Sequence, residues 1–264
     1  MKNSIRLIVL LSLLAFSACT EEQTTQPENE ITAEMIEKLN ELGFNTDNFY
    51  PVQFGETVVV EQDIRLTVSQ INEMLEEGIL PKEEHYSTTN LVSAPRVISV
   101  YVSLPQNYVD ATDQAIARYN AENLTLTFQR VTSASAADIT IVASPWYYGF
   151  FGILGSAGFP TATGDPHNEI QMTRSYYDGV TGGALVTTIA HEMGHCIGFR
   201  HTDYMDRSYS CGGATDDEGA SDVGANHIPG TPTTPSVASW MLACSDGTDR
   251  PFTADDKTAL DYLY

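Results

Sequence analysis

The segment at residues 191–201 reads HEMGHCIGFRH and constrains the fold of this chain more than any other stretch. The apolar residues before and within it predict a helix over 184–197. On that helix His191 and His195 lie one turn apart and project from the same face, so both imidazoles can reach one metal ion at about 2.0–2.1 Å. One helix therefore supplies two metal ligands.

Three further residues complete a site around that ion. Glu192 is rotated by about 100° from His191, which places its carboxylate beside the metal, where it can take a proton from bound water. Gly198 stands where helices commonly end in a left-handed conformation, and such a turn lets His201 return to the metal as a third ligand. Three neutral nitrogen ligands with an open fourth position are typical of catalytic rather than structural zinc.

The predicted reaction is hydrolysis of a peptide bond. A catalytic Zn²⁺ lowers the pKa of its water to roughly 7 and polarises the substrate carbonyl. Glu192 would accept the proton of that water and return it to the leaving amine. Two other classes stay open. A zinc-binding surface adhesion protein without activity would have no need of Glu192, whereas a zinc hydrolase of non-peptide amides would share every local feature.

The pattern HExxHxxGxxH resembles the signature of the metzincin clan of zinc endopeptidases. Because it fixes five positions, its chance occurrence in a chain of this length is on the order of one in a hundred thousand. The residues from His191 to Asp203, together with 252–264, resemble the bacterial dual-action HEIGH metallopeptidases, with Met193 where that name implies Ile. Over 96–264 this resemblance implies an α+β catalytic domain: a twisted mixed sheet with two long helices, then a C-terminal subdomain with a methionine turn and a terminal helix.

Two residues outside the motif are expected to support the metal site. The resemblance implies a methionine turn beneath the metal, for which Met241 in the segment 239–241 is the candidate, with an ordinary core methionine as the alternative. Some metzincins place a tyrosine two residues later, where this chain has Ala243. Asp203 follows the third ligand closely and either orients His201 or is a solvated loop carboxylate.

The pattern ahead of the motif predicts a layered sheet. Strands are expected over 97–103, 124–131 and 138–143, with a helix over 108–122 packed on them. If the metzincin architecture holds, Asn168–Thr173 is the edge strand above the cleft. An extended polypeptide substrate would then pair with this strand by β-augmentation.

The N-terminus predicts export and a lipid anchor. Two basic residues precede an apolar run over 7–16 that is too short for a permanent transmembrane helix, so residues 1–18 are expected to be a signal peptide. Residues 16–19 resemble a bacterial lipoprotein cleavage site, in which Cys19 becomes lipidated. Plain secretion is the alternative. The predicted protein is a bacterial lipoprotein of the cell envelope or surface, attached to the membrane through its lipid only.

The remaining cysteines allow at most one internal disulfide. Cys196, Cys211 and Cys244 are an odd number once Cys19 is lipidated. We predict a bridge between Cys196 and Cys211, which would tie the segment after the third ligand to the preceding helix. Three buried thiols are the alternative.

The chain is strongly acidic, with a formal net charge of −22. Residues 20–90 alone hold 16 acidic and 3 basic residues. Nucleic acid is therefore excluded as a partner, because its phosphates need clustered Lys and Arg. A calcium site is considered at one acidic segment, although the segment lacks the spacing of an EF-hand. Its candidate ligands are Asp216, Asp217, Glu218 and Asp222.

The chain divides into a tether at 19–30, an N-terminal unit at 31–90 and the zinc domain at 91–264. The tether is polar and charged, which is typical of a flexible segment. Periodicity and turn residues predict a small α/β unit ahead of the zinc domain, with helices over 32–42 and 68–77 and a strand or hairpin over 58–66.

This N-terminal unit is a candidate pro-segment. Enzymes of the resembled clan commonly block their metal with a cysteine or an aspartate of such a segment. The unit has no cysteine beyond Cys19, so we expect a carboxylate such as Asp63 to serve. A permanent accessory domain is the alternative. The sequence indicates neither the oligomeric state nor the preferred side chains of a substrate.

Overall fold

The computed structural model describes residues 28–44, 46–47, 49–77, 86–213 and 226–264. Three predictions lie outside these ranges: the signal peptide, the lipidation site Cys19, and the calcium ligands Asp216, Asp217, Glu218 and Asp222. Among the described residues, no helix combines the length and the apolar character that a transmembrane span requires.

The N-terminal unit is a three-stranded antiparallel sheet covered by two helices. The strands β1 (Val52–Phe54), β2 (Thr57–Val60) and β3 (Ile64–Thr67) pair in that order. The helices are α1 (Ala33–Glu41) and α2 (Val68–Glu77). The Thr32 hydroxyl caps α1 by accepting from the Met35 amide, and the helix ends just before Gly43 at φ +84°. The unit has its own apolar cluster, which includes Leu39 and Ile71.

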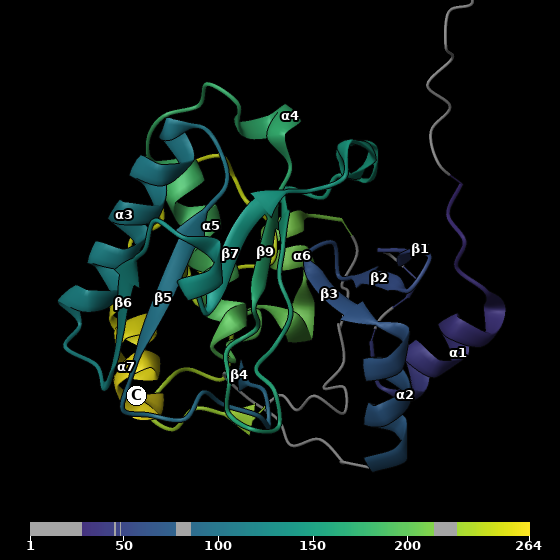
Figure 1. The fold of residues 1–264 in the computed structure, drawn as a ribbon. Helices are drawn as coiled ribbons and strands as arrows, with labels where there is room; N and C mark the ends of the chain where they lie inside the picture. The colour runs from purple at the N-terminus through teal and green to yellow at the C-terminus, as the bar shows by residue number, and fades with distance from the viewer. Residues whose placement is uncertain (1–27, 45, 48, 78–85, 214–225) are drawn as a thin grey trace, which may run out of the picture.

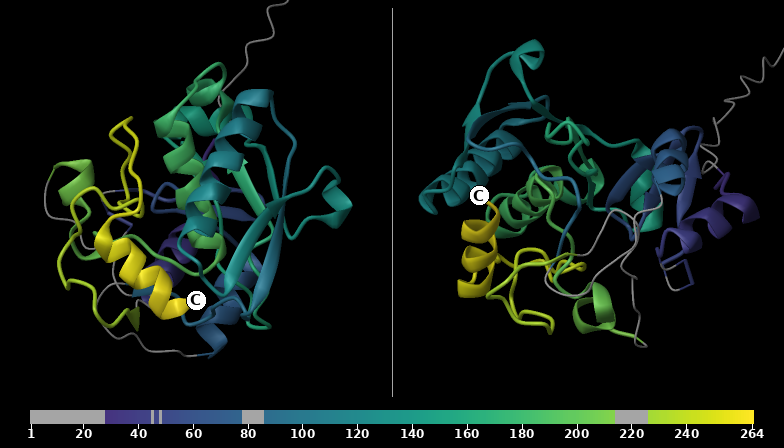
Figure 2. Two further views of the ribbon diagram at one scale, coloured as in Figure 1. Left: turned by 90° about the vertical axis from the view of Figure 1, so that its left-hand side faces the viewer. Right: turned by 90° about the horizontal axis from the view of Figure 1, so that it is seen from below.

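The larger part is built on a five-stranded mixed sheet. Its strands run in the order β6-β5-β7-β9-β8, with every neighbouring pair parallel except β8 and β9. Their bounds are β5 (Arg96–Val102), β6 (Leu126–Arg130), β7 (Ile139–Ala143), β8 (Gly155–Ser156) and β9 (Glu169–Met172). The sheet carries two long helices, α3 (Gln106–Ala121) and α5 (Gly183–Cys196), which pack against each other. Figure 1 and Figure 2 show both helices on the same face of the sheet.

The prediction that residues 168–173 form the edge strand is wrong. They form β9, which lies between β7 and β8, so the edge strand on this side of the sheet is β8. A strand of two small residues, Gly155 and Ser156, has no alternation of apolar and polar side chains that a sequence pattern could reveal.

A C-terminal subdomain follows α5 and ends in α7 (Ala254–Leu263). Thr253 and Asp256 form a capping box at the start of this helix. The remaining short elements are β4 (Tyr86–Ser87), η1 (Ala134–Ala136), η2 (Trp146–Phe151), α4 (Arg174–Tyr177), η3 (Tyr204–Asp206), α6 (Ser208–Cys211) and β10 (Asn226–His227). The predicted α+β class, with its mixed sheet, two long helices and terminal helix, is confirmed.

The disulfide joins Cys211 to Cys244, so the predicted bridge between Cys196 and Cys211 is wrong. Cys196 is the last residue of α5, and its free thiol is fully buried within the main apolar core. Sequence spacing favoured Cys196, but the rotation of the helix turns its side chain into the core. The Cys211 and Cys244 Cα atoms lie 5.1 Å apart, within the usual range for a bridge.

The N-terminal unit contacts the larger part along the free edge of β8. The Arg65 amide donates to the Ala157 carbonyl (2.7 Å), and the Ala157 amide donates to the Asp63 carbonyl (2.9 Å). These bonds form a parallel bridge between β3 and the residue just after β8. The Arg65 guanidinium also binds the Glu169 carboxylate at 2.7 Å. The unit thus lies beside the sheet (Figure 1), and its Asp63 carboxylate lies 3.5 Å from His191 Nε2 on helix α5.

Strand β4 contacts the larger part rather than the N-terminal sheet. It pairs with β10, and Ser87 also bridges to Phe199. The Thr88 amide donates to the Gly198 carbonyl at 2.8 Å. Residues 86–88 therefore pack beside the end of the HExxHxxGxxH motif. The domain boundary after residue 90 stays a prediction.

Candidate metal centre

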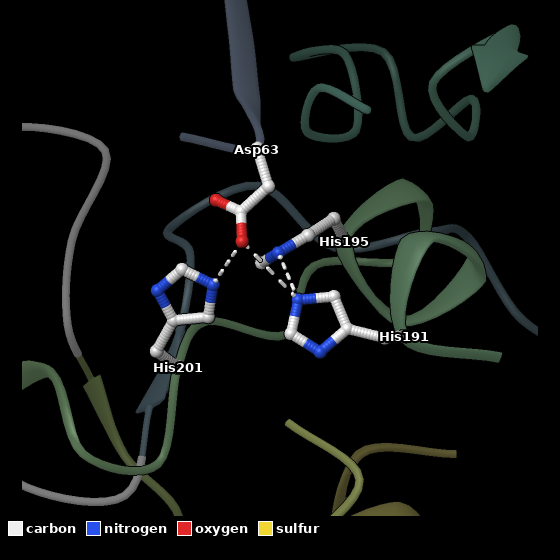
Figure 3. Close-up of side chains that lie close together, drawn as sticks. All are labelled: Asp63, His191, His195 and His201. Carbon is white, nitrogen blue, oxygen red and sulfur yellow. Dashed lines mark hydrogen bonds and ion pairs between the residues drawn. The ribbon is translucent and has the colours of Figure 1, made fainter. Parts of the chain in front are cut away.

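Three histidines and one aspartate converge at a buried point below β3. His191 and His195 project from α5 with their Nε2 atoms 3.0 Å apart. His201 Nε2 lies 3.0 Å from the Asp63 carboxylate, and His191 Nε2 lies 3.5 Å from the same oxygen. One ligand atom from each of the four residues lies within 4.8 Å of all the others (Figure 3). The structure thus brings the three predicted histidines together with the predicted switch residue.

Backbone carbonyls orient the two helical histidines. His191 Nδ1 lies 2.8 Å from the Trp240 carbonyl oxygen, and His195 Nδ1 lies 2.8 Å from that of Phe199. A carbonyl can only accept, so each Nδ1 donates its N–H to it, and in the neutral ring Nε2 then carries the lone pair. This is the tautomer that metal binding requires.

Gly198 allows the chain to bring His201 back toward the helix. Its φ of +106° lies in the left-handed region that favours glycine. A Cβ at this position would also lie 2.8 Å from the Leu91 side chain and 3.0 Å from that of Thr88. Both constraints support the predicted role of Gly198 as the residue that ends the helix.

Met241 packs against α5 between the two helical histidines. A Cβ on Gly194 would lie 2.6 Å from Met241 Sδ, so the glycine makes room for the sulfur. The Met241 carbonyl accepts from the Thr202 amide at 2.9 Å, just after the third histidine. Met241 is fully buried, and its assignment as the methionine turn stays a prediction.

Asp203 stabilises the segment around Met241. Its carboxylate accepts from the Ala243 amide at 2.9 Å, which ties the segment after His201 to the segment after Met241. The residue is completely buried, so it is no solvated loop carboxylate. A direct role of Asp203 in orienting His201 stays a prediction.

Glu192 lies beside the cluster with one oxygen available. Its side chain is buried against β8, where a Cβ on Gly155 would lie 2.6 Å from Glu192 Oε1. Glu192 Oε2 has no hydrogen-bond partner within the part of the chain that the structure describes. A buried carboxylate oxygen of this kind can accept a proton from water or donate one to a substrate.

The two carboxylates at the cluster differ in their affinity for protons. Burial, and then the charge of Asp63, raise the pKa of Glu192 well above its usual value. Burial opposes ionisation of Asp63 too, but the neighbouring histidines lower its pKa well below the usual value. Burial and the two other imidazoles lower the pKa of His195, which keeps it neutral. Neutral imidazoles and an ionised carboxylate are the forms that bind a divalent cation.

The donor set fits zinc. Three imidazole nitrogens and one carboxylate oxygen are the right kinds and the right number of ligands for a tetrahedral site. The carbonyl oxygens of Trp240 and Phe199 supply the outer contacts that such histidines usually have. These four residues can therefore hold a zinc ion.

A cavity opens beside Glu192 and extends along α5. The turn before β3, residues 152–155 and the segment after Met241 form its walls. Residues from these walls and from the helix line it, among them Gln62, Leu154, Thr188, Leu242 and Arg250. It borders His191 and Glu192 directly, so a side chain next to a reacting carbonyl could enter it.

Sequence reasoning missed one pair of residues at this site. The Arg200 guanidinium lies 3.3 Å from both carboxylate oxygens of Glu61, and both side chains are buried. Arg200 occupies an unassigned position of the motif, and Glu61 lies 139 residues upstream. No local pattern links two residues so far apart, and only the fold brings them together.

A model of the dual-action HEIGH metallo-peptidase family matches residues 58–264. The match covers most of the chain, which therefore belongs to this family of metallopeptidases. It begins within β2 and so includes Asp63 together with the three histidines. No curated protein sequence matches the chain.

Two solved structures of similar fold carry the titles "Structure of Myroilysin" and "Crystal structure of myroilysin". The first is 13% identical and covers 67% of this chain and 82% of the myroilysin chain, with a TM-score of 0.42. The second is 14% identical and covers 76% and 98%, with a TM-score of 0.41. The family match, and not these two likenesses, identifies the class of this chain.

Proposed function

We propose that this protein is a zinc-dependent endopeptidase with His191, His195 and His201 as metal ligands and Glu192 as the general base. The observation that carries the proposal is the convergence of three histidine Nε2 atoms on one buried point, two of them on rings oriented by backbone carbonyls. Membership of a metallopeptidase family supports the same reaction class.

Glu192 is suited to move the proton in this reaction. When bound, zinc would supply a water of lowered pKa and polarise the substrate carbonyl. Glu192 would take the proton of the attacking water on Oε2, which has no other partner among the described residues, and return it to the leaving amine. Its raised pKa favours the protonated form that the second step needs.

The polypeptide substrate would bind in extended form along β8, the observed edge strand. Free backbone groups at such an edge can pair with a peptide, so the main chain supplies much of the affinity. The cavity beside Glu192 would then take one substrate side chain. This assignment replaces β9, which the sheet order removes from the edge.

The N-terminal unit would keep the enzyme latent. Asp63 lies where a water or a substrate oxygen would have to approach the histidines, and β3 occupies part of the edge beside β8. Asp63 therefore blocks the cluster, while β3 bridges to the end of the strand-pairing track at Ala157, just after β8. This arrangement supports a zymogen in which the N-terminal unit at residues 31–90 acts as the pro-segment.

Export belongs to the same proposal. The basic residues, the short apolar run and Cys19 support a signal peptide followed by lipidation. The disulfide between Cys211 and Cys244 fits an oxidising compartment. The enzyme would act at the cell envelope or surface.

The test compares full-length Asp63→Ala with the double variant Asp63→Ala, Glu192→Gln after loading with zinc. We expect one zinc per chain in both proteins, and cleavage of a mixed peptide library by the first. Loss of the base should lower turnover by about 10²–10⁴-fold. Undiminished cleavage by the double variant would remove Glu192 from the mechanism. Zinc-loaded Asp63→Ala that cleaves no peptide, even after limited proteolysis of its N-terminal unit, would favour a binding protein or a hydrolase of other amides. A panel of non-peptide amides would separate these two.

A further inference from the structure

The cavity beside Glu192 has one permanent positive charge in its wall. Its volume is about 240 Å³, and among the described residues that line it Arg250 is the only lysine or arginine. The Arg250 side chain is mostly buried but keeps 8% of its surface exposed. Because arginine stays charged in proteins, a substrate side chain that enters this cavity meets a cation.

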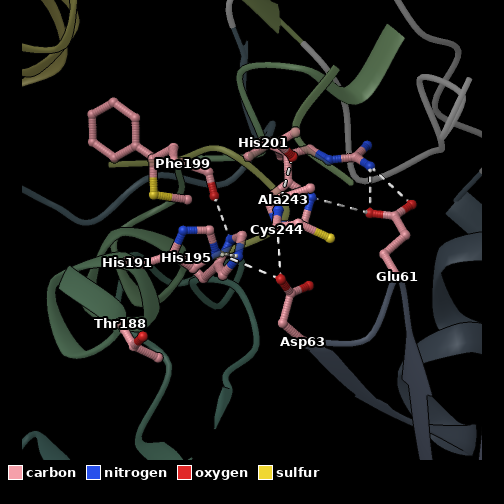
Figure 4. A network of polar contacts seen from close by, with 12 residues as sticks. Glu61, Asp63, Thr188, His191, His195, Phe199, His201, Ala243 and Cys244 are labelled. Carbon is pink, nitrogen blue, oxygen red and sulfur yellow. Dashed lines mark hydrogen bonds and ion pairs between the residues drawn. The ribbon is translucent and has the colours of Figure 1, made fainter. Parts of the chain in front are cut away.

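The backbone of Arg250 is fixed to the helix that carries the metal ligands. The Arg250 amide donates to the Thr187 hydroxyl at 2.8 Å. On α5, Thr187 lies one turn before His191 and Thr188 lies one turn before Glu192. Figure 4 shows Thr188 and His191 on this helix. One turn rises by about 5.4 Å, so the anchor of Arg250 lies about one side-chain length from the metal centre.

The Arg250 guanidinium has two partners in the loop that precedes it. Nη1 donates to the Cys244 carbonyl at 2.9 Å, and Nη2 lies 3.2 Å from the Asp246 carboxylate. An arginine has five N–H donors, so within the described part of the chain these contacts leave the Nε–H and one N–H on each Nη. A further acceptor can therefore bind Arg250 without displacing either partner.

Asp246 offsets only part of this charge. Its Oδ1 accepts from the Thr248 amide at 2.9 Å and from the Thr248 hydroxyl at 2.6 Å. These hydrogen bonds, followed by the charge of Arg250, lower the pKa of Asp246 to about 2. The Asp246 side chain is 54% exposed and is not among the described residues that line the cavity. Water therefore screens its carboxylate, whereas Arg250 borders the cavity itself.

The remaining walls suit the stem of an acidic side chain. Leu154 precedes β8 and Leu242 follows Met241, so two walls of the cavity carry apolar surface. Such surface can pack against methylene groups, while the carboxylate at their end forms charge-assisted hydrogen bonds with a guanidinium. A basic side chain would instead meet a like charge. The cavity thus favours Glu or Asp over Lys or Arg.

We propose that Arg250 is a specificity-determining residue, which binds a glutamate or aspartate side chain of the polypeptide substrate in the cavity beside Glu192. The proposal rests on the proposed endopeptidase function and deepens it. It assigns the substrate class: polypeptides with an acidic residue directly beside the cleaved bond. A residue further along an extended chain lies another 3.3–3.6 Å or so away for each position, beyond the anchor of Arg250.

The test uses zinc-loaded full-length Asp63→Ala as the parent, after limited proteolysis of its N-terminal unit where the uncut form is inactive. Peptide pairs differ only by Glu or Gln, placed first directly before and then directly after the cleaved bond. At one of these positions, kcat/KM for the Glu peptide should exceed that for its Gln twin by about tenfold. Fluorescence anisotropy of the same peptides on the parent with Glu192→Gln gives a second Glu/Gln ratio, of affinities, which needs no turnover.

Substitutions in the loop should move both ratios in opposite directions. Arg250→Met should bring them to about one, and Arg250→Lys should keep intermediate values because its charge remains. Asp246→Asn keeps an acceptor for Thr248 but removes the competing charge, so it should raise the ratios about twofold.

Arg130→Met is the matched control, because it removes one positive charge from β6, at the opposite edge of the sheet. It should keep the parent ratios. Circular dichroism and zinc content verify folding. If Arg250→Met does not fold, Arg250→Lys must still lower the ratios and Asp246→Asn must still raise them.

Each failure has its own meaning. Ratios near one at both positions while Gln peptides are cleaved would overturn the Arg250 site and leave the endopeptidase function intact. Ratios that stay unchanged in both Arg250 variants would do the same. A parent that cleaves no peptide but binds the Glu peptide more tightly, with the preference lost in Arg250→Met, would remove the proposed function and retain the acidic-residue site. A parent that neither cleaves nor discriminates would remove both.

Discussion

Helix α5 and the turn between β2 and β3 reach the same cluster by different routes. The helix supplies His191 and His195 from a continuous segment that is buried from Leu185 to Cys196. The turn supplies Asp63 from 128 residues before His191, through two left-handed residues and two backbone bonds around Ala157. One route is local and rigid, whereas the other depends on docking of a separate unit.

We therefore assign two roles: helix α5 holds the metal, and the turn between β2 and β3 closes the site. Histidines fixed by their own helix and by carbonyls at Trp240 and Phe199 are set before any ion binds. A carboxylate delivered on a docked strand can be withdrawn without disturbing them. The predictions below test this division, beginning with the largest effect.

Loss of His201 should weaken zinc binding far more than loss of Asp63. We expect His201→Ala to lower zinc affinity by more than about 100-fold, since changes even to outer contacts of such ligands cost 10–100-fold. Asp63→Ala should lower it by about tenfold at most, because water can take the vacated position. Competition with a chromophoric chelator measures both. Equal losses would mean that the turn is part of the permanent ligand set.

The same division explains what the sequence could predict. Helical periodicity places His191, Glu192 and His195 on neighbouring faces of one helix. Gly198 predicts the turn that brings the chain back toward that helix. These are local relations, so the motif indicated them directly. Asp63 was predicted only because a pro-segment of the resembled clan needs a blocking group.

Long-range relations escaped prediction. Strand β8 has two residues and no periodicity, so β9 was wrongly placed at the edge of the sheet. The disulfide depends on which way Cys196 faces at the end of α5, and spacing alone favoured the wrong partner. The contact between Glu61 and Arg200 requires the docking of two units whose interface no local pattern describes.

Acid should loosen the docked unit through His167. This residue lies 3.2 Å from the Arg65 guanidinium of β3, and burial, followed by the charge of Arg65, lowers its pKa from 6.5 to about 4. Between pH 6.5 and 4 the unfolded chain binds a proton at His167 that the folded chain does not bind. The free energy of unfolding therefore decreases as the pH is lowered through this interval. The loss approaches about 3 kcal/mol near pH 4.

Urea unfolding of the wild type and of His167→Gln at pH 7 and pH 5 measures this effect. The variant keeps an acceptor for Arg65 but cannot titrate, so its stability should fall less over this interval. The same pH dependence in both proteins would exclude His167 as the acid-sensitive contact.

Gly198→Ala should destabilise the protein by about 2 kcal/mol, because the variant combines a strained φ with contact against Leu91 and Thr88. Gly179→Ala is the control, since Gly179 also has a positive φ of +76° but no atom within 4 Å of a new Cβ. It should cost about 1 kcal/mol or less. Thermal unfolding of the zinc-free proteins compares them. Equal costs would show that close packing around Gly198 contributes nothing.

Binding of a peptide hydroxamate tests the central claim most directly, namely that Asp63 closes the fourth position of a cluster formed by three histidines. Isothermal titration of zinc-loaded full-length protein should give at least about 100-fold tighter binding to Asp63→Ala than to the wild type, a difference of about 2.7 kcal/mol. Binding should disappear in both proteins when zinc is removed. Equal affinities for the wild type and Asp63→Ala would contradict the account, because the position would then be open in the full chain.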